Sequence, residues 1–221
     1  MIVAYTCVTG GYDEIAKVIA SEPCADRQVI FTDVVKSPEL RRGWELLPLV
    51  YRHPVCPRRT ARWHKLSDHC LFPAATYTIW ADGSQQWKKG VSAAGLLDDI
   101  PDVQNMKLAT FKHPDRLCAY TERDKCEQLR KDDSHLMQSQ MLKYRLEGFP
   151  AFYGLVETAC VVRKNCPEVA NFNRAWWGEI EKYSFRDQLS FNYVCWKQNF
   201  RYHIIPGSRE NSKYFIFHAH K

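Results

Sequence analysis

The feature that most constrains the fold is the stretch from residue 76 to residue 84, which reads Thr-Tyr-Thr-Ile-Trp-Ala-Asp-Gly-Ser. Its β-branched and aromatic residues predict a short buried strand that ends at Asp82 and Gly83. A carboxylate at the carboxyl end of a central strand stands where open α/β sheets place their ligands. Asp-Gly is also a common turn dipeptide, so a plain turn is the alternative interpretation of this segment.

Strand-like and helix-like segments alternate along the whole sequence, with no linker-like, low-complexity or repeated segment between them. This alternation predicts one α/β domain over residues 1–221, with a mainly parallel central sheet flanked by helices. Residues 36–58 are rich in Pro and Arg and show little periodicity, so we expect a long loop there. The expected strands are residues 2–7, 28–33, 76–81, 106–111, part of 151–163, 202–205 and 214–218. The expected helices are residues 13–20, 58–65, 91–98, 123–147 (one helix or a pair), 172–183 and 185–197.

Composition narrows the class of protein. With 221 residues, 45% hydrophobic and 25% charged, the chain has the make-up of a soluble globular domain with a sizeable core. Its net charge of +6 suits a phosphate-bearing ligand but is too small to indicate a nucleic-acid partner. The first seven residues lack the basic start of a signal peptide and no apolar span is long enough for a membrane helix, so we expect a cytoplasmic protein.

The nine cysteines show no Cys-x-x-Cys spacing, and several lie in apolar, strand-like runs. Cysteine in such runs behaves as a small hydrophobic residue. The spacing gives no support to a zinc site, and we expect reduced thiols.

Three features of the first hundred residues have the chemistry of a phosphate-binding site. Adjacent glycines in residues 9–11 let the backbone approach a ligand closely, although a plain strand–turn–helix joint would also use them. Asp33 at the tip of the second expected strand could accept hydrogen bonds from a ribose or a base, or cap a turn. Arg58, Arg62 and Lys65 share one helix face that could neutralise a diphosphate. A solvated basic face is the alternative for these three cations.

Nine stretches, in order along residues 2 to about 195, resemble the glycosyltransferase-like domain of a former unknown-function family. Its plant members include mucilage-related hexosyltransferases and a protein described as an alkaline ceramidase. The stretches are Tyr5–Asp13, Arg62–Lys65, His69–Pro73, Ile79–Gly83, Phe111–Glu122, Gln140–Met141, Gly154–Glu157, Trp176–Glu179 and Arg186–Phe191.

The resemblance implies a Rossmann-like glycosyltransferase fold of the A type, with a nucleotide-binding half (about 1–100) and an acceptor-binding half (about 101–221). It implies transfer of a hexose or deoxyhexose from a nucleoside diphosphate donor to a glycan or other hydroxyl acceptor. The residues it assigns to the nucleoside are Thr6, Thr9, Gly10 and Asp33. Those it assigns to the diphosphate are Arg62, Lys65 and Asp82. Those it assigns to the acceptor and the reaction are His113, Arg116, Glu157, Trp177, Arg186, Asp187 and Gln188.

A-type transferases bind Mn²⁺ or Mg²⁺ with the diphosphate through an Asp-x-Asp motif. The corresponding place here reads Trp-Ala-Asp-Gly-Ser, with Asp82 as its single acid, which is a thin set for a hard cation. By the resemblance, His218 or His220 near the end of the chain could add a ligand.

Asp187 resembles the acid beside the anomeric carbon in A-type transferases. An acid that opens a helix lies in a positive backbone field and stays ionised. It could accept a proton from the acceptor hydroxyl or steady an oxocarbenium-like centre. Simple N-capping by Ser184 or Asp187 is the alternative.

Two other functions remain open at this stage. The missing second acid would also fit a catalytically silent module that binds sugar nucleotides or glycans. A lipid amide hydrolase follows from the ceramidase in the family, but the sequence has no Gly-x-Ser-x-Gly motif, no His-Glu-x-x-His motif and no recognisable amphipathic membrane helix.

Overall fold

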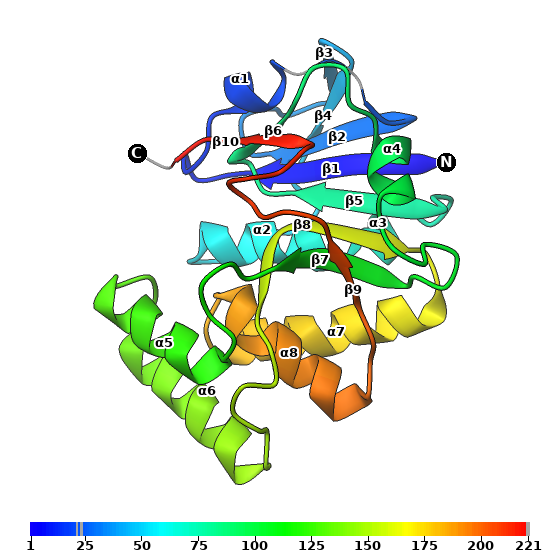
Figure 1. Ribbon diagram of the computed structural model, residues 1–221. Helices are drawn as coiled ribbons and strands as arrows, with labels where there is room; N and C mark the ends of the chain where they lie inside the picture. Colours follow the sequence, from blue (N-terminus) through cyan, green and yellow to red (C-terminus); the bar gives the residue numbers. More distant parts are fainter. Residues whose placement is uncertain (21, 23, 220–221) are drawn as a thin grey trace.

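The computed structural model describes residues 1–20, 22 and 24–219, and its centre is a mixed eight-stranded sheet with the order β3-β4-β2-β1-β5-β8-β7-β9 (Figure 1). The strands are β1 (Ile2–Val8), β2 (Arg27–Thr32), β3 (Glu39–Arg41), β4 (Trp44–Pro48), β5 (Tyr77–Ala81), β7 (Leu108–Lys112), β8 (Val156–Lys164) and β9 (His203–Ile205). A separate antiparallel ribbon consists of β6 (Gln85–Trp87) and β10 (Phe215–Phe217). The helices are α1 (Ile15–Val18), α2 (Pro57–Leu66), α3 (Asp68–Leu71), α4 (Ala93–Asp98), α5 (Ala119–Gln128), α6 (Ser134–Leu146), α7 (Pro167–Lys182) and α8 (Asp187–Gln198).

The pairing of the strands brings several chain ends to one edge of the sheet. Strands β4, β2, β1 and β5 run parallel, so the carboxyl ends of β1, β2 and β5 lie together. Strand β8 runs antiparallel to β5, and the backbone N–H of Asp82 donates to Ala159 O at 2.8 Å. The amino end of β8 therefore lies at the same edge. The predicted α/β architecture is confirmed, and within the eight-stranded sheet four pairs of neighbouring strands are parallel and three are antiparallel.

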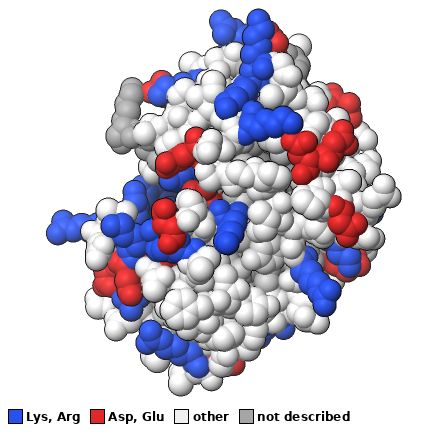
Figure 2. All heavy atoms as spheres, viewed as in Figure 1, with Lys and Arg blue, Asp and Glu red and all other residues white. Residues whose placement is uncertain are grey.

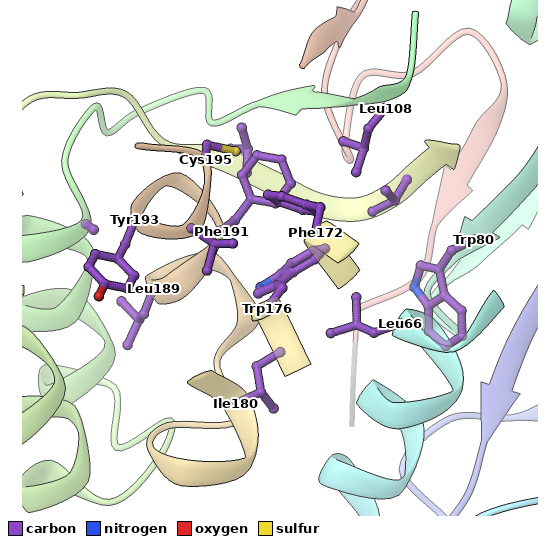
Figure 3. Close-up of a cluster of buried hydrophobic side chains, with 14 of the residues drawn as sticks. Leu66, Trp80, Leu108, Phe172, Trp176, Ile180, Leu189, Phe191, Tyr193 and Cys195 are labelled. Atoms are coloured by element: carbon purple, nitrogen blue, oxygen red, sulfur yellow. The ribbon is translucent and has the colours of Figure 1, made fainter. Parts of the chain in front are cut away.

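Side chains from the two faces of the sheet enter two hydrophobic cores. Along β1, Val3, Tyr5 and Cys7 point to one core, and Ala4 and Val8 point to the other. This alternation is the two-residue period of a strand. The first core is filled by rings from β5, α7 and α8, including the fully buried cluster in Figure 3. Its labelled aromatic members are Trp80, Phe172, Trp176, Phe191 and Tyr193.

The expected long loop over residues 36–58 is wrong. Residues 39–41 and 44–48 form β3 and β4, and β4 pairs in parallel with β2. Trp44 and Leu46 alternate into the second core, but this pattern is only two residues long and lies between Pro- and Arg-rich flanks. Pro48 is compatible with the strand because it stands at its last position, where a missing N–H does no harm.

Other helices and strands also differ from their predicted boundaries. The helix expected over residues 13–20 is a single turn, and the segment 123–147 is a helix pair whose first member begins at Ala119. Strand β6 and helix α3 were not expected, since each is only three or four residues long. The nine cysteines are free, as predicted. In the part of the chain that the structure describes, no helix has the length and apolar character needed to cross a membrane.

A buried histidine predicts how stability depends on pH. His64 is fully buried in α2, with Nδ1 placed 2.8 Å from Thr60 O and Nε2 accepting the Val50 N–H at 3.1 Å. Burial lowers the pKa of His64 from 6.5 to about 4. The unfolded chain then binds more protons between these two values, so stability is complete above pH 6.5 and falls as the pH drops towards 4.

Between pH 6.5 and pH 4 we expect His64 to lower the free energy of unfolding by about 3 kcal/mol, at roughly 1.4 kcal/mol per pKa unit. Urea unfolding at pH steps from 8 to 4 should show the loss. The variant His64→Gln should lose much of the slope, whereas the exposed His135→Gln should keep it. Equal slopes in the wild type and in His64→Gln would contradict this account.

Candidate functional site

A cleft of about 450 Å³ opens at the edge of the sheet where β1, β2 and β5 end. Its walls come from the loop after β1, the first half of α2, the turn after β5, the start of β8 and the start of α8. Basic and acidic side chains gather on this side of the molecule, on the left in Figure 2. Of the residues predicted for the site, those that line the cleft are Thr9, Gly10, Arg62, Asp82, Glu157, Arg186, Asp187 and Gln188.

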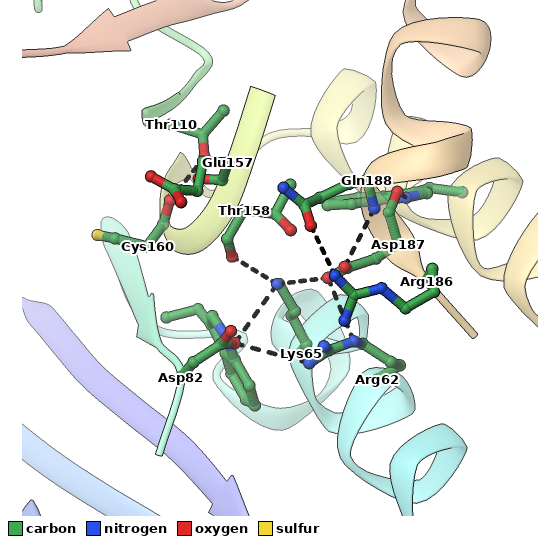
Figure 4. A network of polar contacts seen from close by, with 12 residues as sticks. Arg62, Lys65, Asp82, Thr110, Glu157, Thr158, Cys160, Arg186, Asp187 and Gln188 are labelled. Atoms are coloured by element: carbon green, nitrogen blue, oxygen red, sulfur yellow. Dashed lines mark hydrogen bonds and ion pairs between the residues drawn. The ribbon is translucent and has the colours of Figure 1, made fainter. Parts of the chain in front are cut away.

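Two cations and two carboxylates form a network at the cleft, in which Arg62, Asp82 and Asp187 line the cleft and the fully buried Lys65 does not (Figure 4). Lys65 Nζ donates to Asp187 Oδ2 at 2.6 Å and to Thr158 O at 2.5 Å, and lies 3.6 Å from Asp82 Oδ1. Arg62 Nε lies 3.2 Å from Asp187 Oδ2, and its Nη1 lies 3.6 Å from Asp82 Oδ1. Asp82 is therefore not held in an isolated turn, because two helix cations that also contact Asp187 lie 3.6 Å from it.

The sequence of α2 explains this arrangement. Arg62 and Lys65 are three residues apart and share the helix face towards β5 and α8. Arg59 points elsewhere, to the end of α7, where it donates to Ile180 O, to Glu181 O at 2.9 Å and to Tyr183 O at 2.6 Å. Since Lys65 is fully buried and Arg62 is largely so, a solvated basic face is excluded for these two residues.

Electrostatics keep the network at the cleft charged. Burial by itself would raise the pKa of Asp187, but the charges of Arg62 and Lys65 and the Lys65 hydrogen bond hold it well below the usual carboxyl value. Complete burial lowers the pKa of Lys65, and Asp187 and Asp82 oppose that shift. Asp187 Oδ1 also accepts the backbone N–H of Gln188 at 3.1 Å, and Ser184 Oγ accepts that of Arg186 at 3.1 Å. Asp187 is therefore held both by the first turn of α8 and by the two cations.

A second acid reaches the Asp82 turn from another part of the chain. Asp82 Oδ1 accepts the Trp80 indole N–H at 2.6 Å, and Gly83 follows it. A Cβ atom on Gly83 would stand 2.6 Å from Asp13 Oδ2, so the Asp13 side chain packs directly against this glycine. Asp13 lies in the loop after β1 and lines the cleft. Asp13 was not predicted as a site residue. The glycine at position 83, which leaves room for its side chain, is the sequence feature that could have indicated it.

These oxygens do not fit a cation site built from protein ligands alone. Asp82 Oδ1 already has an indole N–H and two cations nearby. Among the described residues, no group of three or more His, Cys, Asp or Glu side chains could hold a metal ion. His218 does not line the cleft, and its Nε2 lies 2.8 Å from Gln86 Oε1 in the β6–β10 ribbon. His220 lies outside the described residues, so a manganese or magnesium requirement stays a prediction.

Glu157, at the start of β8, is held by a residue that follows β9. Its Oε2 accepts the backbone N–H of Arg209 at 2.9 Å, and its Oε1 lies 3.2 Å from Arg209 Nε. Burial raises the pKa of Glu157, although these two contacts oppose the shift. Among the cleft acids with resolved shifts, Glu157 is therefore the one best suited to accept a proton near neutral pH. Arg209 was not predicted.

Two residues predicted to hold the nucleoside are not among those that line the cleft. Thr6 is buried in β1 on the opposite face of the sheet from Cys7, which does line the cleft. Successive side chains of a strand point to opposite faces, so Cys7 faces the cleft and the predicted Thr6 faces away from it. Asp33 accepts the Thr9 hydroxyl at 2.7 Å and the Gly10 N–H at 2.8 Å, and so braces the loop after β1. Its contact with a nucleoside stays a prediction.

Three residues predicted for the acceptor side also lie outside the cleft lining. His113 and Arg116 form a compact group with Glu122, in which Arg116 Nε donates to Glu122 Oε2 at 2.5 Å. Trp177 is half-buried on α7 and meets the ring of Tyr51 edge to face. These placements lend no support to a substrate contact in this cleft.

Comparison with known proteins places the chain among glycosyltransferase-like domains. The family model described as "TOD1/MUCI70, glycosyltransferase-like domain" matches residues 43–219. The chain is 26% identical over 145 residues to the Arabidopsis thaliana protein named "Probable hexosyltransferase MUCI70", a match that covers 62% of this chain and 25% of the relative. The chain thus spans about a quarter of that relative's length. A similar solved structure is the apo form of the bifunctional glycosyltransferase WbbM, with a TM-score of 0.46 and 13% identity over 87% of this chain and 36% of that one.

Proposed function

We propose that this chain, which belongs to the TOD1/MUCI70 glycosyltransferase-like domain family, transfers a hexose or deoxyhexose from a nucleoside diphosphate donor to a hydroxyl group of a glycan or similar acceptor. The observation that carries the proposal is the convergence of Arg62 and Lys65 on Asp82 and Asp187 in a cleft at the carboxyl edge of the sheet. This edge is where α/β proteins bind nucleotides.

The donor diphosphate would lie against Arg62 at the floor of the cleft. In sugar transfer the bond from the anomeric carbon to the diphosphate breaks, and negative charge grows on the leaving phosphate oxygen. Arg62 offers several N–H donors to that oxygen, and Lys65 behind it adds a buried positive charge. Without a donor, the two cations are balanced by Asp82 and Asp187, which keeps the empty cleft from carrying unpaired buried charge.

Asp187 and Glu157 would have different roles in the reaction. Asp187, whose pKa is lowered, stays ionised and can steady positive charge that develops at the anomeric carbon. Glu157, whose pKa is raised, can take the proton from the attacking acceptor hydroxyl. Arg186 and Gln188 beside Asp187 are linked by a 3.0 Å hydrogen bond and offer further contacts to sugar hydroxyls. A bound Mn²⁺ or Mg²⁺ would supply additional positive charge to the diphosphate.

The test is calorimetric titration with a panel of uridine and guanosine diphosphate sugars, with and without manganese. We expect at least one donor to bind, and Arg62→Met to weaken it roughly 10- to 100-fold, the effect of losing hydrogen bonds to a charged group. The exposed Arg201→Met should leave the affinity unchanged. If no donor binds under any condition, the proposal fails.

The variant Asp82→Ala separates two modes of donor binding. If an ion bridges Asp82 and the diphosphate, the variant should lose affinity only when manganese is present. If Arg62 and Lys65 act without a metal, the variant should bind as well as the wild type or better, because one anion near the phosphates is gone. Donor binding with neither transfer nor donor hydrolysis would identify a silent binding module instead.

A further inference from the structure

One flat cation that lines the cleft contacts two aromatic rings. The guanidinium of Arg58 lies 4.7 Å from the ring centroid of Tyr12 and 5.0 Å from that of Phe185. The three side chains come from the loop after β1, the first turn of α2 and the loop before α8, and all three line the cleft. They therefore join its two walls across the opening.

Arg58 is weakly held in this position. It is exposed, and its hydrogen bond from Nη1 to Lys131 O is long at 3.3 Å. Contacts between a cation and a ring are weak when water reaches the cation. Arg58 differs in this respect from Arg62, which is buried and contacts two carboxylates. A ligand that enters the cleft can therefore displace Arg58 at little cost.

The segment that carries Phe185 is firmly held. The backbone N–H of Phe185 donates to Asp132 Oδ2 at 2.8 Å, and the buried Ser184 hydroxyl donates to the same oxygen at 2.6 Å. Just before them, Arg59 holds Tyr183 O at 2.6 Å. Asp132 precedes α6, so the α5–α6 connection fixes the backbone of Phe185. A preformed wall lowers the ordering cost of binding.

We propose that the place which the Arg58 guanidinium occupies against the rings of Tyr12 and Phe185 is the slot for the nucleobase of the donor, with Arg58 as the group that the base displaces. This inference rests on the proposed function and adds a site to it. A base is flat and has two π-faces, as the guanidinium has, and stacks on aromatic side chains with little regard to its identity.

The position of the slot agrees with the diphosphate site. Arg58 and Arg62 are four residues apart on α2, which is about one helical turn or 5.4 Å along the axis. A base in the slot and a phosphate at Arg62 would thus be separated by about the length of the ribose that joins them. Once displaced from the rings, the Arg58 side chain remains close enough to α2's cleft face to contact the phosphates, so it would exchange a stacking contact for a charged one.

The experiment is calorimetry with uridine diphosphate, guanosine diphosphate and inorganic pyrophosphate on the wild type, Tyr12→Leu and Phe185→Leu. We expect each variant to bind the better nucleoside diphosphate roughly 10-fold or more weakly, since base stacking of this kind is typically lost on removal of the ring. Pyrophosphate, which has no base, should bind all three proteins within about 2-fold. The exposed Tyr153→Leu, whose ring does not line the cleft, is the matched control.

Urea unfolding midpoints close to the wild type would show that the variants are folded. A second variant, Arg58→Gln, should bind uridine or guanosine without phosphates at least as well as the wild type, because the slot is no longer filled by a cation. Unchanged nucleotide affinity in both ring variants would overturn the slot while leaving the transferase proposal intact. If the wild type binds pyrophosphate but no nucleotide, the slot is likewise overturned, and if it binds neither, both proposals fail.

Discussion

Replacing Asp187 by Asn should lower the rate of sugar transfer by about 10²- to 10⁴-fold, a loss typical of removing a positioned charged group from a transition state. The amide has nearly the shape of the carboxylate but cannot balance positive charge at the anomeric carbon. Donor binding should be kept or tightened, because Arg62 and Lys65 lose an anion that competes with the diphosphate. The prediction is therefore a fall in kcat with donor affinity unchanged or higher.

The measurement is initial-rate kinetics with the donor that calorimetry identifies, together with direct titration of that donor. Asp133→Asn is a matched control, since Asp133 also stands at the start of a helix, and its side chain caps α6 by accepting the Leu136 N–H at 2.9 Å. Asparagine serves as a cap equally well, so that variant should keep its rate. A near-normal rate in Asp187→Asn would show that Asp187 does not stabilise the positive charge that develops at the anomeric carbon.

Much of the site could be predicted because it depends on local periodicity and on one rule of sheet topology. The residues after parallel strands meet at one edge, which brings Asp82 and the loop after β1 together. Helical spacing placed Arg62 and Lys65 on a common face. The two patterns required no knowledge of contacts between distant segments, and the structure brings Asp82 within ion-pair distance of both cations.

The rest of the site depends on contacts that no local pattern encodes. Asp13 reaches the Asp82 turn only because Gly83 leaves room for it. Arg209 comes from a loop more than fifty residues after Glu157, which it contacts. To choose Cys7 over Thr6, one must know which face of β1 meets the cleft. Both faces of this strand are buried, so the polarity of its residues does not distinguish them. Strand β4 was not predicted because Pro and Arg residues flank its short apolar pattern.

The Lys65–Asp187 pair should also have a large effect on stability. Lys65 is fully buried and Asp187 is 3% exposed, so removing either partner leaves a charge in a poorly solvated place. We expect Lys65→Met and Asp187→Leu each to lower the free energy of unfolding by about 3–5 kcal/mol. The double variant should lose far less than the sum, because two apolar side chains of similar size can pack against Trp80 and Trp176, whose rings lie 5.7 and 5.9 Å from Lys65 Nζ.

Urea unfolding of the four proteins at pH 7 measures this coupling, and the exposed pair Lys107 and Glu168 is the control, for which about 0–1 kcal/mol is expected. Because the pKa of Asp187 is lowered in the folded protein, the coupling should be complete above the usual carboxyl value of 3.8 and decline as the pH falls below it. Additive losses at pH 7 would show that the two side chains contribute separately. If the double variant is as stable as the wild type, the fold does not need these charges. Their presence at the cleft would then be explained by the anionic ligand they are placed to meet.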